Sequence, residues 1–129
     1  MTRLAIKEFY DLAKQAESIL DSTYDCRKAE PLYVKILKLV KSHADLRQEF
    51  VGAFLAMLGG KDGPWELIQF CMRELQWVEI KEALVNLRKA EINGSHDWRV
   101  ISVLNDILAV YEPVWEDADL YEYYSKENN

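Results

Sequence analysis

The stretch from Gly52 to Ala90 constrains the fold more than any other part of this chain. It holds two dense apolar patterns with helical spacing on either side of a glycine-rich break, and a third pattern follows almost at once. Burying one large apolar side chain stabilises a fold by about 1.5–3 kcal/mol, so side chains this numerous and this regularly spaced belong in a core. We therefore expect this stretch to organise a helical domain.

The break itself predicts the end of one helix and the start of another. Gly59 and Gly60 are natural closing residues, because glycine tolerates the left-handed conformation at a helix C-terminus. Pro64 suits the first position of the next helix, and Glu66 then lies near the positive end of that helix dipole. The apolar residues of the preceding helix are Leu46, Phe50, Phe54, Leu55 and Leu58.

The helix after the break is apolar around more than half of its circumference, which predicts a central helix packed on two sides. Its apolar residues are Trp65, Ile68, Phe70, Cys71, Met72 and Leu75. We expect Phe54 and Phe70 to pack across the connection. Trp77 marks a bend into a further helix, whose inward residues are predicted to be Ile80, Ala83, Leu84 and Leu87.

The rest of the chain also has helical periodicity. Residues 3–20 predict a first helix and residues 21–25 a loop, and a second helix is expected to begin near Pro31. Ser42, three residues before Asp45, predicts a cap for a third helix that follows directly. After Gly94, with Ser95 or Asp97 as the cap, a strong amphipathic helix is predicted, with these apolar residues: Trp98, Ile101, Leu104, Ile107, Leu108 and Tyr111.

Pro113 should stop that helix, because proline removes a backbone donor. A short last helix capped by Asp117 is expected within residues 114–124, and residues 125–129 should fray. The prediction is an all-α single domain over residues 1–129, with about six helices in an antiparallel bundle or a solenoid-like array. Short-linked helix pairs resemble the units of α-solenoids such as HEAT repeats, a likeness of geometry that implies nothing about function.

Length and residue usage predict a cytoplasmic location. No apolar run approaches 18 residues, and the first residues lack the apolar stretch of a signal peptide. Cys26 and Cys71 are the two cysteines, and thiols in that compartment stay reduced, so we expect no disulfide. Association with a membrane is not expected.

Charge is distributed unevenly along the chain. The formal net charge is −6, and residues 112–129 carry six carboxylates against one lysine, a net charge of −5. Residues 21–43 carry five cations against three carboxylates, a net charge of +2. An acidic chain lacks the basic surface on which nonspecific binding to nucleic acid or anionic membranes depends. The patterning therefore favours a basic protein as partner.

Residues with catalytic or metal-binding potential do not form a recognisable site in the sequence. Cys71 lies between Phe70 and Met72, a setting typical of a buried small hydrophobe, whereas a nucleophile needs a nearby base. A metal site formed by His43, Asp45, His96 and Asp97 lacks metal-ligand spacing. The glycines near residue 60 do not form a phosphate-binding loop. We expect no enzymatic activity, no cofactor and no metal.

The acidic C-terminal segment is the predicted partner-binding site. It combines carboxylates with tryptophan and tyrosine, which are enriched at the centres of protein interfaces. The candidate residues are Trp115, Glu116, Asp117, Asp119, Tyr121, Glu122, Tyr123 and Tyr124. The alternative is that the segment folds back and buries Trp115, Leu120 and one tyrosine against the preceding helix. In that case its acids should contact Lys35, Lys38 and Lys41.

Three functions remain open on these observations. The first is a non-enzymatic module that binds a basic protein, in its sharpest form an inhibitor of the bacterial immunity-protein kind that neutralises a cationic toxin or nuclease. The second is a structural or adaptor module that binds a partner helix in a groove. The third is an enzyme with dispersed active-site residues. Homo-oligomerisation is compatible with all three.

Overall fold

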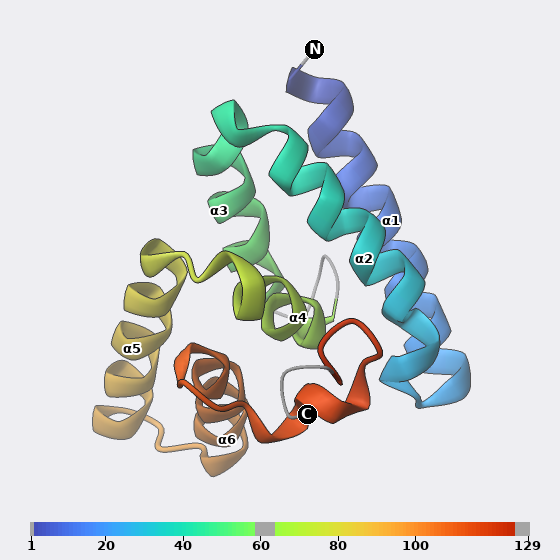
Figure 1. Ribbon diagram of the computed structural model, residues 1–129. Coiled ribbons are helices and arrows are strands. Elements are labelled where there is room, and N and C mark those ends of the chain that lie inside the picture. The colour runs from blue at the N-terminus through green and yellow to red at the C-terminus, as the bar shows by residue number, and fades with distance from the viewer. Residues whose placement is uncertain (1, 59–63, 126–129) are drawn as a thin grey trace.

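The computed structural model describes residues 2–58 and 64–125, and over these residues the fold is all-α, which confirms the predicted class (Figure 1). The described residues form six α-helices: α1 (Thr2–Thr23), α2 (Cys26–Ser42), α3 (Arg47–Met57), α4 (Trp65–Leu75), α5 (Val78–Asn93) and α6 (Trp98–Leu108). Three short 3₁₀ helices complete them: η1 (Ala44–Leu46), η2 (Ala109–Tyr111) and η3 (Glu116–Leu120).

Helices α1 and α2 lie side by side and are joined by a much tighter turn than predicted (Figure 1). The expected loop over residues 21–25 is reduced to Tyr24 and Asp25, and α2 begins at Cys26, five residues before Pro31. The reason is a cap, because the Asp25 carboxylate accepts a hydrogen bond from the Arg27 backbone N–H at 3.0 Å. Tyr24 takes the left-handed conformation, with φ of 56°, that the turn requires.

The connection from α2 to α3 also differs from its prediction. The Ser42 hydroxyl donates to the Leu39 carbonyl oxygen at 3.0 Å, so it closes α2 and does not cap the next helix. The 3₁₀ turn η1 intervenes before α3, and the side chain of Leu46 in that turn is buried. A serine at a helix end can bond backward or forward, and here the backward bond wins.

Helix α4 is the centre of the fold, packed against α2 on one side and α6 on the other, which confirms the two-sided burial predicted for it (Figure 1). It begins at Trp65, with Pro64 as the preceding cap residue, one position later than predicted. The glycines predicted to close the preceding helix, Gly59 and Gly60, lie outside the described residues. Gln76, with φ of 52°, ends α4 in the left-handed conformation and produces the bend expected at Trp77.

Phe54 and Phe70 are both fully buried, as predicted, but they belong to different aromatic groups. The Phe54 ring centroid lies 5.1 Å from that of Phe9 and 6.0 Å from that of Trp77. Phe70 instead contacts the tyrosines of α2 and of the C-terminal segment. The core therefore has one aromatic group under α1 and α3 and another under the C-terminal segment.

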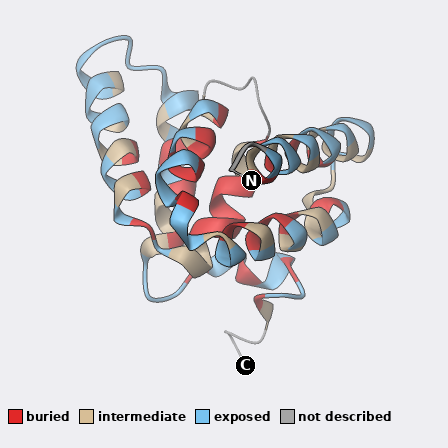
Figure 2. Cartoon of the chain, turned by 90° about the horizontal axis from the view of Figure 1, so that it is seen from above, coloured by how far each residue is buried: buried red, intermediate tan, exposed pale blue. Residues whose placement is uncertain are grey.

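Helices α5 and α6 form the edge of the molecule (Figures 1 and 2). Only Ile80 and Leu84 are buried on α5, and Leu87, predicted to face inward, is 44% exposed. Asp97, one of the two predicted caps, caps α6 by accepting from the Arg99 backbone N–H at 3.0 Å. Trp98, predicted to be a packing residue, is 70% exposed because it is the first residue of α6 and does not reach the core. Across the two described ranges, no helix combines the length and apolar character of a membrane span.

Candidate functional site

The C-terminal segment, residues 112–125, alternates buried and exposed residues with a period of three. Trp115, Ala118, Tyr121 and Tyr124 are all buried, and the residues between them are exposed. A 3₁₀ helix has three residues per turn, so side chains at this spacing lie on one face, and η3 supplies that geometry. The segment thus has one apolar face toward the protein and two faces toward solvent.

The apolar face packs against Phe70 of α4. The Phe70 ring centroid lies 5.1 Å from Tyr121 and 5.0 Å from Tyr124, and Trp115 lies 6.1 Å from Tyr121. Tyr33 of α2 adds a ring at 5.5 Å from Phe70. Offset and edge-on ring pairs at such separations stabilise by about 0.5–1.5 kcal/mol each beyond the area they bury. We call Tyr33, Phe70, Trp115, Tyr121 and Tyr124 the aromatic cluster.

Arg73 of α4 holds the beginning of the segment. Its guanidinium donates to the carbonyl oxygens of Val110 at 2.9 Å, Glu112 at 2.6 Å and Pro113 at 3.1 Å. These carbonyls lie where the helical path of α6 and η2 ends, so they lack helical partners. The Gln76 side-chain amide donates to the same Val110 oxygen at 2.9 Å. One turn of α4 therefore fixes the point at which the segment leaves α6.

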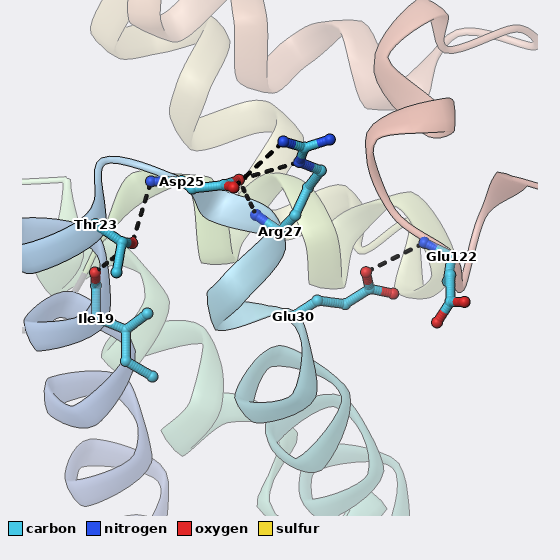
Figure 3. Close-up of polar contacts among 6 residues, drawn as sticks. All are labelled: Ile19, Thr23, Asp25, Arg27, Glu30 and Glu122. Carbon is cyan, nitrogen blue, oxygen red and sulfur yellow. Dashed lines mark hydrogen bonds and ion pairs between the residues drawn. The ribbon is translucent and has the colours of Figure 1, made fainter.

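Glu30 of α2 holds the far end of the segment (Figure 3). Its carboxylate accepts hydrogen bonds from the backbone N–H groups of Glu122 at 3.1 Å and Tyr123 at 2.9 Å. Among the described residues, the predicted contact between the acids of the segment and the α2 lysines is therefore wrong, because an acid of α2 binds the segment backbone instead. Lys41 pairs with Glu74 of α4. Within residues 2–58 and 64–125, Lys35 and Lys38 form no ion pair.

Glu74 and Tyr123 form a hydrogen-bonded titrating pair at the surface of the segment. The Tyr123 hydroxyl donates to Glu74, and this hydrogen bond raises the pKa of Tyr123 to about 12. Partial burial alone would raise the pKa of Glu74, but hydrogen bonds from Lys41 and Tyr123 outweigh it and lower the pKa below the usual 4.5. Glu74 is therefore ionised at neutral pH and is a structural acceptor.

The predicted site residues are separated into two sets by this arrangement. Trp115, Tyr121 and Tyr124 point into the aromatic cluster and leave a partner almost no surface, which corrects their expected place among contact residues. Leu120, expected to be buried if the segment folded back, is 45% exposed. The residues that remain on the surface are Glu116, Asp117, Asp119, Glu122 and Tyr123. The fold-back alternative thus holds for the aromatic face, with α4 and α2 as the covering helices.

The residues considered for catalysis or metal binding lie apart from this surface. Cys71 is fully buried, and burial raises the pKa of its thiol far above the usual value, so the reactive thiolate is disfavoured. Both cysteines are free. His43 is half-buried with Nδ1 2.9 Å from the Leu39 carbonyl oxygen, and His96 is exposed. Among the residues that the structure describes, no group of three or more His, Cys, Asp and Glu side chains is placed to hold a metal ion.

Sequence reasoning missed Arg73, Glu30 and Glu74, the three side chains that hold the segment in place. Arg73 contacts carbonyls 37 to 40 residues away, and Glu30 contacts N–H groups 92 and 93 residues away. No local pattern carries that information. The period of three from Trp115 to Tyr124, in contrast, was visible in the sequence and is the signal that predicts which aromatic residues face inward.

Comparisons of this chain with protein-family models, with curated proteins and with solved structures find no match. Its function is therefore inferred from the geometry and chemistry of its own residues.

Proposed function

We propose that this protein is a non-enzymatic binding module that engages a basic partner protein through the carboxylates of its C-terminal segment. The observation that supports it is the exposed acidic face of a segment whose backbone is held at both ends and whose aromatic face is buried. Glu116, Asp117 and Glu122 are exposed on this face. Because the backbone is ordered before binding, less conformational entropy is lost when a partner docks.

The negative charge of this face favours a partner protein with a basic surface. Exposed carboxylates attract a cationic protein over a distance of about 8 Å at physiological ionic strength and raise its association rate. Tyr123, 39% exposed, adds an aromatic contact of the kind enriched at interface centres. The sharpest form of the proposal is an immunity-type inhibitor in the cytoplasm that occludes a cationic toxin or nuclease. Nucleic acids and anionic membranes are poor partners for the same electrostatic reason.

The proposal is tested by affinity capture from a lysate of the source organism, with mass spectrometry to identify the captured protein. The bait is the whole protein, compared with a Glu116→Gln/Asp117→Asn variant. A Glu8→Gln/Glu82→Gln variant is the matched control, because it removes the same charge from exposed helical positions that the structure places outside the segment. We expect one basic protein to be captured by the wild type and by the control.

Association rates measured on the purified pair complete the test. Removing two interface charges should slow association about tenfold at low salt and flatten its salt dependence, with little change in dissociation. If the captured protein is acidic, or if the segment variant and the control associate equally fast, the C-terminal segment is not the interface.

A further inference from the structure

A cavity of about 490 Å³ opens between α1, α4 and α6, with the end of α3 at one edge. None of the described residues that form its walls belongs to the C-terminal segment. The apolar part of the walls consists of Leu20, Met57, Leu58, Trp65, Val103 and Leu104. Small-molecule sites are usually clefts of roughly 300–1,000 Å³ with mainly apolar walls and a few polar groups that orient the ligand. The size and wall chemistry of this cavity fall within that description.

Ionisable side chains occupy the same walls with an excess of negative charge. Glu17 and Asp21 lie one turn apart on α1, Glu66 lies in the first turn of α4, and Arg99 lies on α6. Three carboxylates therefore face one guanidinium. Over the two described ranges none of the four takes part in an ion pair, so these charges are not used to hold the fold together. A ligand that complements them carries a positive charge.

Glu66 is the carboxyl group of the cavity whose pKa is raised. It is half-buried, and this burial raises the pKa of its carboxyl above the usual 4.5, because apolar walls replace water around the charged form. A cation bound nearby would stabilise the carboxylate. Its neighbour Trp65 lines the same cavity, and indole is the aromatic ring that attracts cations most strongly.

We propose that this cavity binds a small organic cation, an amine with an apolar body, held by Glu17, Asp21 and Glu66 through its ammonium group and by the apolar walls through its body. This site is separate from the acidic C-terminal segment, and it stands or falls independently of the proposed protein partner. Apolar contact supplies the affinity and the carboxylates supply selectivity for the cation.

Three probes that share one apolar body and differ in charge test the proposal. They are 4-phenylbutylamine, 4-phenylbutanol and 5-phenylpentanoate, each titrated into the ¹⁵N-labelled full chain and followed by two-dimensional NMR. The amine should bind at least about tenfold more tightly than the alcohol, and the carboxylate most weakly. Resonances of Leu20, Trp65 and Val103 should move together, and added salt should weaken the amine alone.

Variants separate the charge effect from the cavity effect. Glu17→Gln/Asp21→Asn should weaken the amine about fivefold or more and leave the alcohol unchanged. The control Glu8→Gln/Glu82→Gln, with the same loss of charge elsewhere, should bind the amine like the wild type. Val103→Phe, which fills part of the cavity, should weaken all three probes. Thermal unfolding followed by circular dichroism verifies that each variant is folded.

Equal affinity for the three probes would overturn the proposal, because the carboxylates would then contribute nothing. Absence of binding by the amine at millimolar concentration would overturn it as well. So would an amine that shifts resonances of the C-terminal segment instead of the cavity walls. None of these outcomes bears on capture of a basic protein by the segment, so the two proposals fail separately.

Discussion

The C-terminal segment and the α5–α6 edge differ in how well their secondary structure agrees with the burial of their large side chains. The segment contains no α-helix, yet Trp115, Tyr121 and Tyr124 are almost fully buried. Helices α5 and α6 are regular, yet Leu87 and Trp98 remain largely exposed. The segment has an amphipathic face that α4 and α2 cover, whereas the outer side of α5 faces solvent (Figure 2).

The difference shows that periodicity decides which side chains share a face, while burial requires another element to cover that face. Helix α4 contributes the ring of Phe70, which packs against Tyr124, and the guanidinium of Arg73, which donates hydrogen bonds to the backbone where the segment begins. Helix α5 packs mainly against α3 and α6. Hydrophobic stabilisation follows the area removed from water, so the two regions should respond differently to the same substitutions.

The largest difference is expected for the two tryptophans. Trp115→Ala should lower the free energy of unfolding by about 3–5 kcal/mol, because it empties a buried aromatic site. Trp98→Ala should change it by less than about 0.5 kcal/mol. Urea unfolding followed by circular dichroism measures both. Equal losses would mean that the α5–α6 edge is as well covered as the segment.

The next largest difference in unfolding free energy is expected between variants of Arg73 and Arg88. Arg73→Met removes the donors to three carbonyl groups and should cost about 2 kcal/mol. Arg88→Met, at the α5–α6 edge, removes one exposed hydrogen bond to the Asn105 side chain, 2.8 Å long, and should cost about 0.5 kcal/mol. The same urea experiment compares them. A neutral Arg73→Met would show that the aromatic cluster and the contacts of Glu30 and Glu74 hold the segment without Arg73.

Removing the hydroxyl from each of two tyrosines should reverse the order of the regions, with the larger loss at the α5–α6 edge. The Tyr111 hydroxyl donates to the Trp77 carbonyl oxygen at 2.9 Å, so Tyr111→Phe should cost about 1 kcal/mol. The Tyr33 hydroxyl is buried in the aromatic cluster and has no hydrogen-bond partner in the described structure. Tyr33→Phe should therefore leave stability unchanged or raise it. A loss above about 1 kcal/mol in Tyr33→Phe would reveal a partner for that hydroxyl.

The smallest difference between a variant and its control is expected at Tyr123, and it depends on pH. Tyr123→Phe should cost about 0.5 kcal/mol at pH 7, since it removes a partly exposed hydrogen bond to Glu74. The lowered pKa of Glu74 means that its contribution is present above pH 4.5 and is lost as pH falls through the folded-state value. The raised pKa of Tyr123 means that its contribution is present below pH 10 and is lost as pH rises toward about 12.

The measurement is the difference in unfolding free energy between wild type and variant across this pH range. Tyr24→Phe serves as the control, because that side chain is 91% exposed and is not expected to show the dependence. A constant difference from pH 3 to pH 7 would contradict the assignment of Glu74 as the acceptor.

Much of the fold was predictable from local patterns. The bend at Trp77 and the cap at Asp97 follow from residue chemistry that acts within a few positions, and both are confirmed. The start of α2 differs from its prediction because the Asp25 cap outweighs the signal of Pro31, and a helix tolerates a proline in its early turns at the loss of one backbone bond. Errors of this kind concern competition between two local signals.

The candidate site was predictable only in part. Its location in the acidic C-terminal segment follows from composition, and the inward aromatic face follows from the spacing of three residues from Trp115 to Tyr124. The clamps at Arg73 and Glu30 were not predictable, because their partners lie tens of residues away in the chain.

By itself, the sequence determined that this chain is helical, that α4 is its central helix and that the carboxylates gather near the C-terminus. Each of these depends on the order of side chains along a few turns. Only the tertiary structure decided that Trp115 is buried and Trp98 exposed, and that Glu116 and Asp117 face solvent. The physical reason is that helical periodicity is set by neighbours in the chain, whereas burial is set by whichever element lies across from it in space.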